Sequence, residues 1–242
     1  MINKPTYKPF GERAILIEWD AKIDEKILND ILLFKEKIIQ EQLDLSDTIV
    51  GYNSLTLLFK NRILDFRQQT SVLKEIYQKE SLHKKEDNYL WEIPVCYDST
   101  FGWDLEDLAH QKKLSISEII ELHTASLYTV FFIGFLPGFP YLSGLNEKLF
   151  MDRKPNPRLK VPKGAVGIGG KQTGIYPQET PGGWNIIGKT PIQLFDVSKQ
   201  TPCFLKSGDQ IKFNPISIDQ YSEIEHRITK GNYELNKSLK DD

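Results

Sequence analysis

Cysteine, methionine and histidine are scarce in this chain of 242 residues, which has two Cys, two Met and four His. Cys96 and Cys203 form no C-x-x-C pair and have no histidine nearby, so the spacing excludes a zinc ribbon or a dithiol redox motif. The histidines show no metal-ligand spacing either, and no metal site is predicted. We expect both thiols to be free and buried in a reducing compartment, which makes the cytoplasm the expected location.

Long apolar runs and an excess of one charge are also absent. No apolar run approaches the roughly 20 residues needed to cross a bilayer, and the first ten residues lack the apolar core of a signal peptide. The 31 Lys and Arg residues nearly balance 33 Asp and Glu residues, and the net charge of -2 gives no electrostatic footprint for nucleic acid. With 40% hydrophobic and 26% charged residues, the composition is typical of a soluble globular protein.

Glycine is scarce at the start of the chain, where apolar residues follow strand-like and then helix-like patterns. Asp24 is placed to cap the first helix. The order strand, helix, strand, helix predicts a small α/β sandwich domain over residues 1–88, which ends in the polar stretch Ser81–Asn88. The predicted elements are a strand at 13–19, a helix at 24–43, a strand region at 49–59 and a helix at 70–82.

Residues 89–222 favour a second domain that is rich in β structure. Tyr89–Tyr97 predicts a strand, and Pro94 within it suggests an edge position. A helix is expected at 104–113, and Ser115–Glu118 matches a capping box at the start of another. Short apolar segments punctuated by Gly and Pro follow, which favours a closed or sandwich-like β structure. These segments are 128–133, 165–168, 184–187, 192–195 and 210–213.

The last stretch, residues 223–242, is strongly charged and is expected to form a helix or a frayed tail outside both domains.

Three segments combine glycine, proline and aromatic residues: Phe135–Gly144, Val161–Pro177 and Glu179–Gly188. Glycine lets a backbone approach a ligand closely and proline fixes φ, so such loops are shaped and stiff. Their aromatic side chains are therefore expected to line a pocket. The alternative is that the segments are barrel turns and the aromatic residues belong to the core. The residues concerned are Phe139, Tyr141, Tyr176 and Trp184.

The stretch Gly167–Thr173 has the composition of a phosphate loop without its spacing. A Walker A motif needs Gly, four residues and then Gly-Lys-Ser/Thr, but Ala165 stands at the first glycine position and Gln172 at the hydroxyl position. Gln172 also replaces the third glycine of a dinucleotide fingerprint. The backbone amides could still hold an anion, with Lys171 either taking part or remaining a solvated charge.

His123 is the histidine of most interest, because it lies near the end of a predicted amphipathic helix and shortly before the first glycine-rich segment. The alternative to a functional role is a favourable interaction with the helix C-terminus. Neither a Gly-x-Ser-x-Gly elbow nor an evident carboxylate pair accompanies it in the sequence. Spacing alone therefore predicts a ligand site and no mechanism.

The three segments together resemble the signature of the KipI family, also called the allophanate hydrolase subunit 1 family, which includes the B subunit of 5-oxoprolinase. The matching stretches are Gly134–Leu145, Pro157–Gly164, Gly174–Pro177 and Pro181–Pro191, and the resemblance extends over residues 7–218. It implies an α+β chain in which a small N-terminal α/β sandwich domain is followed by a cyclophilin-like β-barrel domain. The family often has a serine where this chain has Ala165, so any chemistry that needs a hydroxyl there is missing.

The resemblance implies a subunit of ATP-dependent 5-oxoprolinase, which opens 5-oxo-L-proline to L-glutamate with ATP hydrolysis. It also implies the A and C subunits of that enzyme as partners, inactivity of the chain alone, and use of ATP by the complex, without indicating whether ATP binds this chain. On this hypothesis His123 transfers protons or orients the substrate, while Arg158 and Lys163 hold a carboxylate or phosphate. The other expected substrate-binding residues are Phe139, Tyr141, Gln172, Thr173, Tyr176 and Trp184.

Other activities remain open within this resemblance. Members like KipI inhibit a sporulation histidine kinase, which would make the barrel an interaction module. A subunit of allophanate hydrolase or urea carboxylase is another alternative, although the chain has neither a biotin-attachment Met-Lys-Met nor an amidase Ser-Ser-Lys signature. Prolyl isomerase activity follows from fold analogy only.

Overall fold

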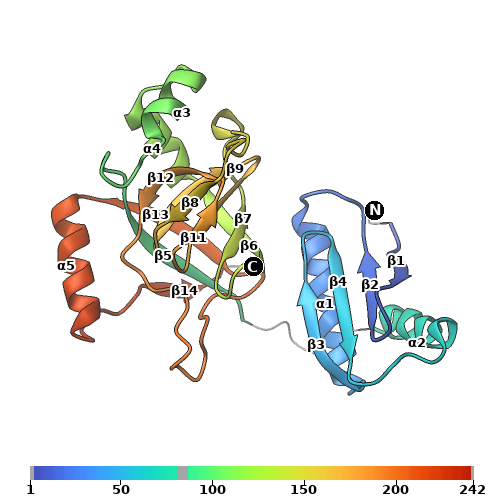
Figure 1. The fold of residues 1–242 in the computed structure, drawn as a ribbon. Coiled ribbons are helices and arrows are strands. Elements are labelled where there is room, and N and C mark those ends of the chain that lie inside the picture. Colours follow the sequence, from blue (N-terminus) through green and yellow to red (C-terminus); the bar gives the residue numbers. More distant parts are fainter. Residues whose placement is uncertain (1–2, 81–86, 241–242) are drawn as a thin grey trace. The chain divides into compact units, whose positions relative to one another are not determined.

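The computed structural model describes residues 3–80 and 87–240, and the chain divides into two units, Met1–Glu86 and Asp87–Asp242 (Figure 1). The predicted boundary segment, Ser81–Asn88, falls largely on residues 81–86, which lie outside the described residues. Each unit contains both helices and strands, and the predicted α+β class is confirmed.

In the first unit, an antiparallel sheet with the strand order β1-β2-β4-β3 is combined with two helices. Alternate residues of the central strands are buried, among them Ile15, Ile17, Leu55 and Leu57, as expected for a sheet with one covered face. The elements are β1 (Thr6–Pro9), β2 (Ala14–Glu18), α1 (Glu25–Gln40), β3 (Leu45–Val50), β4 (Ser54–Phe59) and α2 (Phe66–Gln78).

Both helices of this unit begin after an aspartate that accepts hydrogen bonds from the first turn. Asp24 accepts from the amide of Lys26, as its position in the sequence predicts. Asp65 accepts from two amides of α2, so this helix starts earlier than the expected residue 70. The two helices pack together through Phe34 and Tyr77, whose rings meet edge to face at 4.9 Å.

In the second unit, seven strands form a closed barrel in the order β12-β9-β10-β7-β6-β13-β5, and β5 pairs again with β12 at Cys96 and Lys189. Only the β13–β5 pair is parallel. The barrel confirms the closed β structure expected from the sequence. Its strands are β5 (Tyr89–Cys96), β6 (Leu127–Ile133), β7 (Pro140–Ser143), β9 (Ala165–Gly169), β10 (Gln172–Ile175), β12 (Asn185–Lys189) and β13 (Gln210–Ile216).

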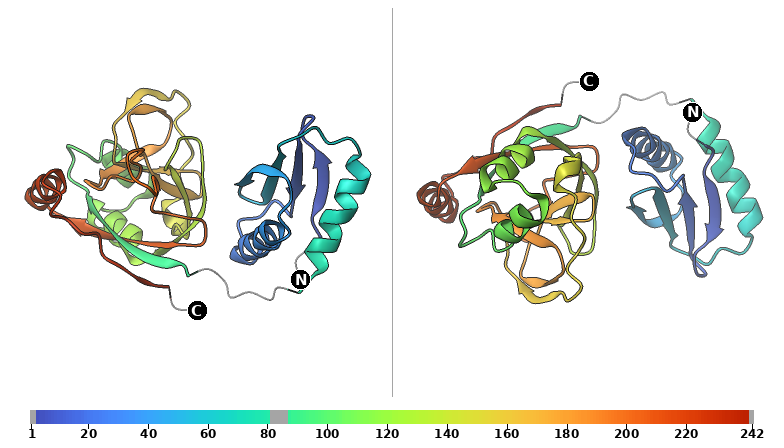
Figure 2. Two further views of the ribbon diagram at one scale, coloured as in Figure 1. Left: turned by 90° about the horizontal axis from the view of Figure 1, so that it is seen from below. Right: turned by 90° about the horizontal axis from the view of Figure 1, so that it is seen from above.

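The remaining elements cover the barrel. Helices α3 (Leu105–Lys112) and α4 (Ile116–Ala125) and the short 3-10 helix η1 (Glu147–Leu149) lie toward one end of it, and β14 (Lys237–Leu239) pairs with β5 toward the other (Figure 1). Strands β8 (Arg158–Val161) and β11 (Thr180–Gly182) form a separate two-stranded ribbon. Helix α5 (Ile218–Thr229) stands on the outer side of the barrel in both views of Figure 2. Apolar side chains from β5, β6, β9 and β13 fill the interior.

Three expectations for the second unit were wrong. Residues 192–195 form no strand and contribute only an isolated bridge from Phe195 to Cys203. Pro94 is not on an edge strand, since β5 pairs along one side with β13 and on the other with β14 and β12; Pro94 lies between those last two pairings. Residues 223–242 do not form a separate tail, because α5 and β14 connect them to the barrel.

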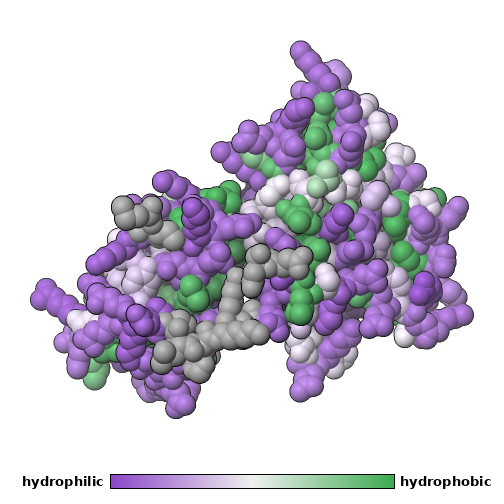
Figure 3. Space-filling view, turned by 180° about the vertical axis from the view of Figure 1, so that it is seen from behind, coloured by the Kyte–Doolittle hydropathy of each residue, from purple (hydrophilic) through white to green (hydrophobic). Residues whose placement is uncertain are grey.

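The thiols and the surface complete this description. Both cysteines are free, and Cys96 is buried whereas Cys203 is half-buried. No helix of the described residues combines the length and hydropathy that a membrane span requires. The face shown in Figure 3 is mostly hydrophilic, with hydrophobic residues in small separate patches.

Candidate functional site

The three glycine-rich segments meet around a cavity of about 270 Å³, which we call the aromatic recess. Four aromatic residues predicted as pocket residues line it together, and residues 153–157 supply another wall. The lining residues are Phe135, Phe139, Tyr141, Arg153, Lys154, Pro157, Tyr176, Pro181, Gly182, Gly183 and Trp184.

Phe139 is the centre of the aromatic cluster. Its ring meets Tyr176 edge to face at 5.1 Å and Trp184 at 5.4 Å, a favoured geometry for aromatic pairs. Phe139 and Tyr176 are 1% exposed and Trp184 is 4% exposed, so these rings are core residues that also present an edge to the recess. The two alternatives drawn from the sequence are therefore both partly correct.

The glycines make room for these rings. A Cβ on Gly182 would collide with the Tyr176 hydroxyl. A Cβ on Gly174 would lie 2.9 Å from the Trp184 ring and 2.8 Å from the Pro140 carbonyl oxygen, closer than ordinary contacts allow. These positions need glycine because the aromatic cluster occupies the space of a side chain.

Phe135 has an unusual backbone conformation at the recess. Its φ is +63°, a left-handed value that a bulky residue rarely adopts. The amide of Leu136 donates to the Gly134 carbonyl at 2.7 Å, which places Phe135 at the centre of a three-residue turn. Its ring is 61% exposed and meets Phe139 edge to face at 5.7 Å. Strain combined with an exposed ring at a cavity indicates a functional constraint.

This strain predicts a difference between two substitutions that both remove the ring. Phe135→Gly should be more stable than Phe135→Ala by about 1 kcal/mol, because only glycine adopts positive φ without a steric penalty. Chemical denaturation of the two variants measures this difference. Equal stabilities would contradict the strained backbone.

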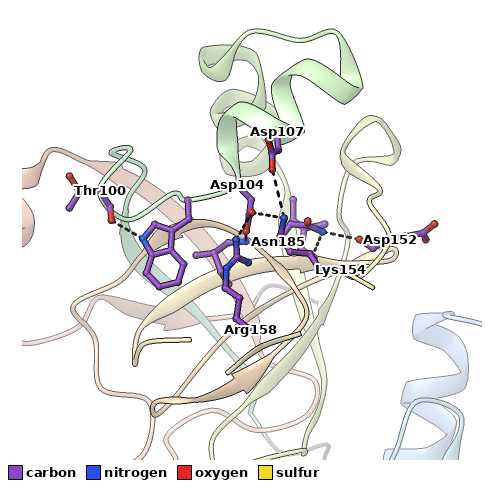
Figure 4. A network of polar contacts seen from close by, with 10 residues as sticks. Thr100, Asp104, Asp107, Asp152, Lys154, Arg158 and Asn185 are labelled. Carbon is purple, nitrogen blue, oxygen red and sulfur yellow. Dashed lines mark hydrogen bonds and ion pairs between the residues drawn. The ribbon is translucent and has the colours of Figure 1, made fainter. Parts of the chain in front are cut away.

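A buried aspartate organises the charges beside the recess (Figure 4). Asp104 is 1% exposed, and its Oδ1 accepts from Lys154 Nζ and from Arg158 Nη2, each at 2.7 Å. Its Oδ2 accepts from the amide of Ile186 at 2.7 Å. Burial would raise the pKa of Asp104, but the hydrogen bonds from Arg158, Lys154 and Ile186 outweigh it and hold the pKa below its usual value. Asp104 is therefore a carboxylate that fixes two cations.

Arg158 is thus placed differently from the sequence expectation. Its guanidinium pairs with Asp104 and lies 5.5 Å from the ring of Trp103. One nitrogen, Nη1, is buried and has no hydrogen-bond partner in the part of the chain that the structure describes. A contact between this free donor and an anion stays a prediction.

The recess carries positive charge and neutral phenols at its walls. The guanidinium of Arg153 lies 5.7 Å from the ring of Trp184, within cation–π range. Burial raises the pKa of Tyr141 and of Tyr176, so both phenols remain protonated and can donate a hydrogen bond at neutral pH. The arrangement can hold a small ring with an anionic substituent.

His123 lies in the barrel interior and does not line the recess. It is 0% exposed, with Nδ1 2.8 Å from the Tyr97 hydroxyl and Nε2 3.1 Å from Thr173 Oγ1. Its ring stacks on Phe213 at 4.7 Å. Burial lowers the pKa of His123 to about 3, so the imidazole is neutral at physiological pH. The expected proton transfer from His123 and ligand contact from Thr173 are replaced by a structural hydrogen-bond chain, because both ring nitrogens are already used and no solvent reaches them.

The remaining expected residues lie elsewhere. Lys163 is exposed and Gln172 is buried, and neither lines the recess. Sequence reasoning missed Asp104, Arg153 and Lys154 as organising residues. Adjacent basic residues in a proline-containing stretch between two glycine-rich segments were the available signal for the last two. No group of three metal-ligating side chains occurs among residues 3–80 and 87–240.

Residues 5–205 match a family described as the carboxyltransferase domain, subdomain C and D. The chain belongs to this family. Among curated relatives, the 5-oxoprolinase B subunit of Bacillus subtilis is 37% identical over 87% of this chain and 92% of its own length. The 5-oxoprolinase B subunit of Haemophilus influenzae is 37% identical over 85% of this chain and 95% of its own length.

Two solved structures extend the comparison. The crystal structure of TTHA0988 aligns with a TM-score of 0.73 and 33% identity over 85% of this chain, which spans only 40% of that protein. The urea amidolyase of K. lactis aligns with a TM-score of 0.81 and 18% identity over 98% of this chain and 16% of that one. At this identity the second alignment supports the fold alone.

Proposed function

We propose that this chain is the B subunit of an ATP-dependent 5-oxoprolinase and that the aromatic recess receives the lactam ring. The observation that carries the proposal is 36–37% identity, over most of the chain, to three proteins named as the B subunit of 5-oxoprolinase. In the reaction, 5-oxo-L-proline and water give L-glutamate, coupled to ATP and water giving ADP and phosphate. An unstrained lactam resists water, so phosphorylation of its carbonyl oxygen would supply the activation.

The recess suits a small lactam that carries a carboxylate. Phe135 and Trp184 offer apolar surface to the ring, and Arg153 offers a planar cation to the carboxylate at the rim. The protonated phenol of Tyr141 is a donor for the lactam carbonyl oxygen. His123 would act only indirectly, by holding Thr173 and β10 in place.

Partner chains and ATP belong to this proposal. The chain would act in the cytoplasm with the A and C subunits and would be inactive alone, as the names of its relatives suggest. The test is co-expression with candidate A and C subunits, followed by measurement of glutamate release that depends on both ATP and 5-oxoproline. Absence of release, together with inhibition of a histidine kinase's autophosphorylation by the purified chain, would favour the regulatory alternative.

Within an active complex, removal of the Phe135 ring should weaken substrate binding. Phe135→Ala and Phe135→Gly should each raise KM for 5-oxoproline about tenfold, since each loses a wall of the recess. Leu159→Ala is the control, because Leu159 is 85% exposed on β8 and does not line the recess. An unchanged KM in both Phe135 variants would place the substrate elsewhere.

A urea-degrading role is the second candidate. The chain is 27% identical to the urea amidolyase of Saccharomyces cerevisiae, over 93% of this chain and 12% of that protein. This activity would need other chains or domains to supply the biotin and the amidase. ATP-dependent consumption of urea by the co-expressed set, without glutamate release from 5-oxoproline, would support it.

A further inference from the structure

A second cavity adjoins the aromatic recess. It has a volume of about 480 Å³ and shares Arg153 and Lys154 with the recess, and we call it the basic hollow. Its charged lining consists of four cationic side chains and one carboxylate: Lys112, Arg153, Lys154, Lys171 and Asp152. A hollow with this excess of positive charge, in a chain whose net charge is -2, is a local feature and does not follow from the overall composition.

The backbone that carries these cations is fixed at three places. Met151 and Gly170 exchange two backbone hydrogen bonds of 3.0 and 2.7 Å, which brings the β9–β10 turn, and with it Lys171, to this segment. The side-chain amide of Asn185 donates to the Asp152 carbonyl at 2.9 Å. The amide of Lys154 donates to the Gly183 carbonyl at 2.7 Å. The cations are therefore held together before any ligand arrives, which reduces the entropic cost of binding.

The cations differ in how far they are already neutralised. Lys154 Nζ lies 2.7 Å from buried Asp104 and 3.7 Å from Asp107. Arg153 and Lys171 instead lie over the rings of Trp184 and Phe150, at 5.7 and 5.8 Å, and form no ion pair with a carboxylate of the described chain. An aromatic face attracts a cation without satisfying its N–H donors. Arg153 and Lys171 thus have donors to offer to an anion.

The backbone amide of Gly170 is not available for this purpose, because it donates to Met151. The glycine-rich turn at 167–173 therefore cannot act as an amide cradle through Gly170, and binding would depend on side chains. Lys171 is then neither part of a phosphate loop nor an isolated solvated charge.

We propose that the basic hollow binds a phosphate-bearing anion, with Arg153 and Lys171 as its principal ligands. A single carboxylate would fill little of the volume and neutralise one cation, whereas a phosphoanhydride carries several charges and acceptor oxygens to match. The shared residue Arg153 places this anion beside the ring that the recess would hold. The inference deepens the proposed function, on which its link to lactam activation rests, but anion binding itself can be measured on the chain alone.

The test is calorimetric titration of the purified full chain, at low ionic strength, with pyrophosphate, ATP and glutamate as separate probes. Pyrophosphate and ATP should bind, and Arg153→Gln and Lys171→Gln should each weaken both about tenfold. Lys230→Gln, an exposed charge on the C-cap of α5, is the matched control and should leave the affinity unchanged. Added salt should weaken binding, because these cations lie at the surface.

Three outcomes would overturn the proposal: no binding of pyrophosphate or ATP, equal losses in Lys230→Gln, or binding of glutamate alone through the same residues. Binding of ATP but not pyrophosphate, without loss in the two variants, would also overturn it and place the nucleotide elsewhere. Pyrophosphate binding in a chain whose complex releases no glutamate would leave the anion site standing and reject the oxoprolinase function.

Discussion

Replacing Asp104 by asparagine is expected to lower the free energy of unfolding of the second unit by about 3 kcal/mol. Asp104 is 1% exposed and is the shared partner of Lys154 and Arg158, whose side chains are 24% and 27% exposed. Asparagine can still accept from the Ile186 amide, but it leaves two partly buried cations without a counter-charge. Solvent around these cations keeps the loss at the lower end of the range for broken buried ion pairs.

Asp107→Asn is the matched control for this substitution. Asp107 approaches the same Lys154 at 3.7 Å but is 66% exposed, so its loss should change stability by less than about 0.5 kcal/mol. Denaturant unfolding monitored on the second unit measures both. Similar losses in the two variants would mean that Asp104 does not organise the network. Anion titration of Asp104→Asn should also show altered affinity, because Lys154 would be released into the basic hollow.

Acidification is expected to destabilise the second unit through His123. Unfolded histidine takes up a proton near its ordinary pKa of 6.5, whereas burial delays this uptake in the folded chain until about pH 3. Between these values the unfolded state binds more protons, so the free energy of unfolding falls as pH drops. The contribution is about 1.4 kcal/mol per pH unit, or about 2 kcal/mol between pH 6.5 and 5. Above pH 6.5 this contribution to stability is fully present.

The difference between the wild type and His123→Asn isolates this effect from other titrating groups. The variant should be less stable at neutral pH, since Tyr97 and Thr173 lose their partner, and its stability should fall less steeply below pH 6.5. Thr173→Val also loses a hydrogen bond but keeps the buried imidazole, so it should retain the steeper dependence. Parallel curves for the wild type and His123→Asn would show that His123 does not titrate in this way.

Local signals in the sequence predicted local structure well. Asp24 and the capping box at Ser115 fixed two helix starts, since both depend on residues within one turn. Strands of three or four residues, such as β7, β8, β10 and β11, were not predicted individually. Their glycine and proline content hides the alternation that marks longer strands, and their pairing is set by the closed barrel.

Long-range pairing limited the prediction of the site. Phe139, Tyr176 and Trp184 were placed correctly because glycine spacing around aromatic residues indicates close packing. Arg158 was expected to face a ligand, but its partner Asp104 lies 54 positions earlier at the start of α3. Burial likewise decided the outcome for His123, since nothing in its neighbouring residues reveals that α4 turns it into the barrel.

The pairing of β14 with β5 brings the exit of the second unit next to its entrance. The amide of Lys240 donates to the Asn88 carbonyl at 2.9 Å, so the backbone leaves the barrel where it came in. Figure 1 places this corner at the end opposite α3, whereas Asp104 immediately precedes α3. Surface attachment or a fluorophore introduced after Lys240 would therefore leave the ligand-facing end of the barrel unobstructed, which makes the C-terminus the favoured handle for immobilised binding assays.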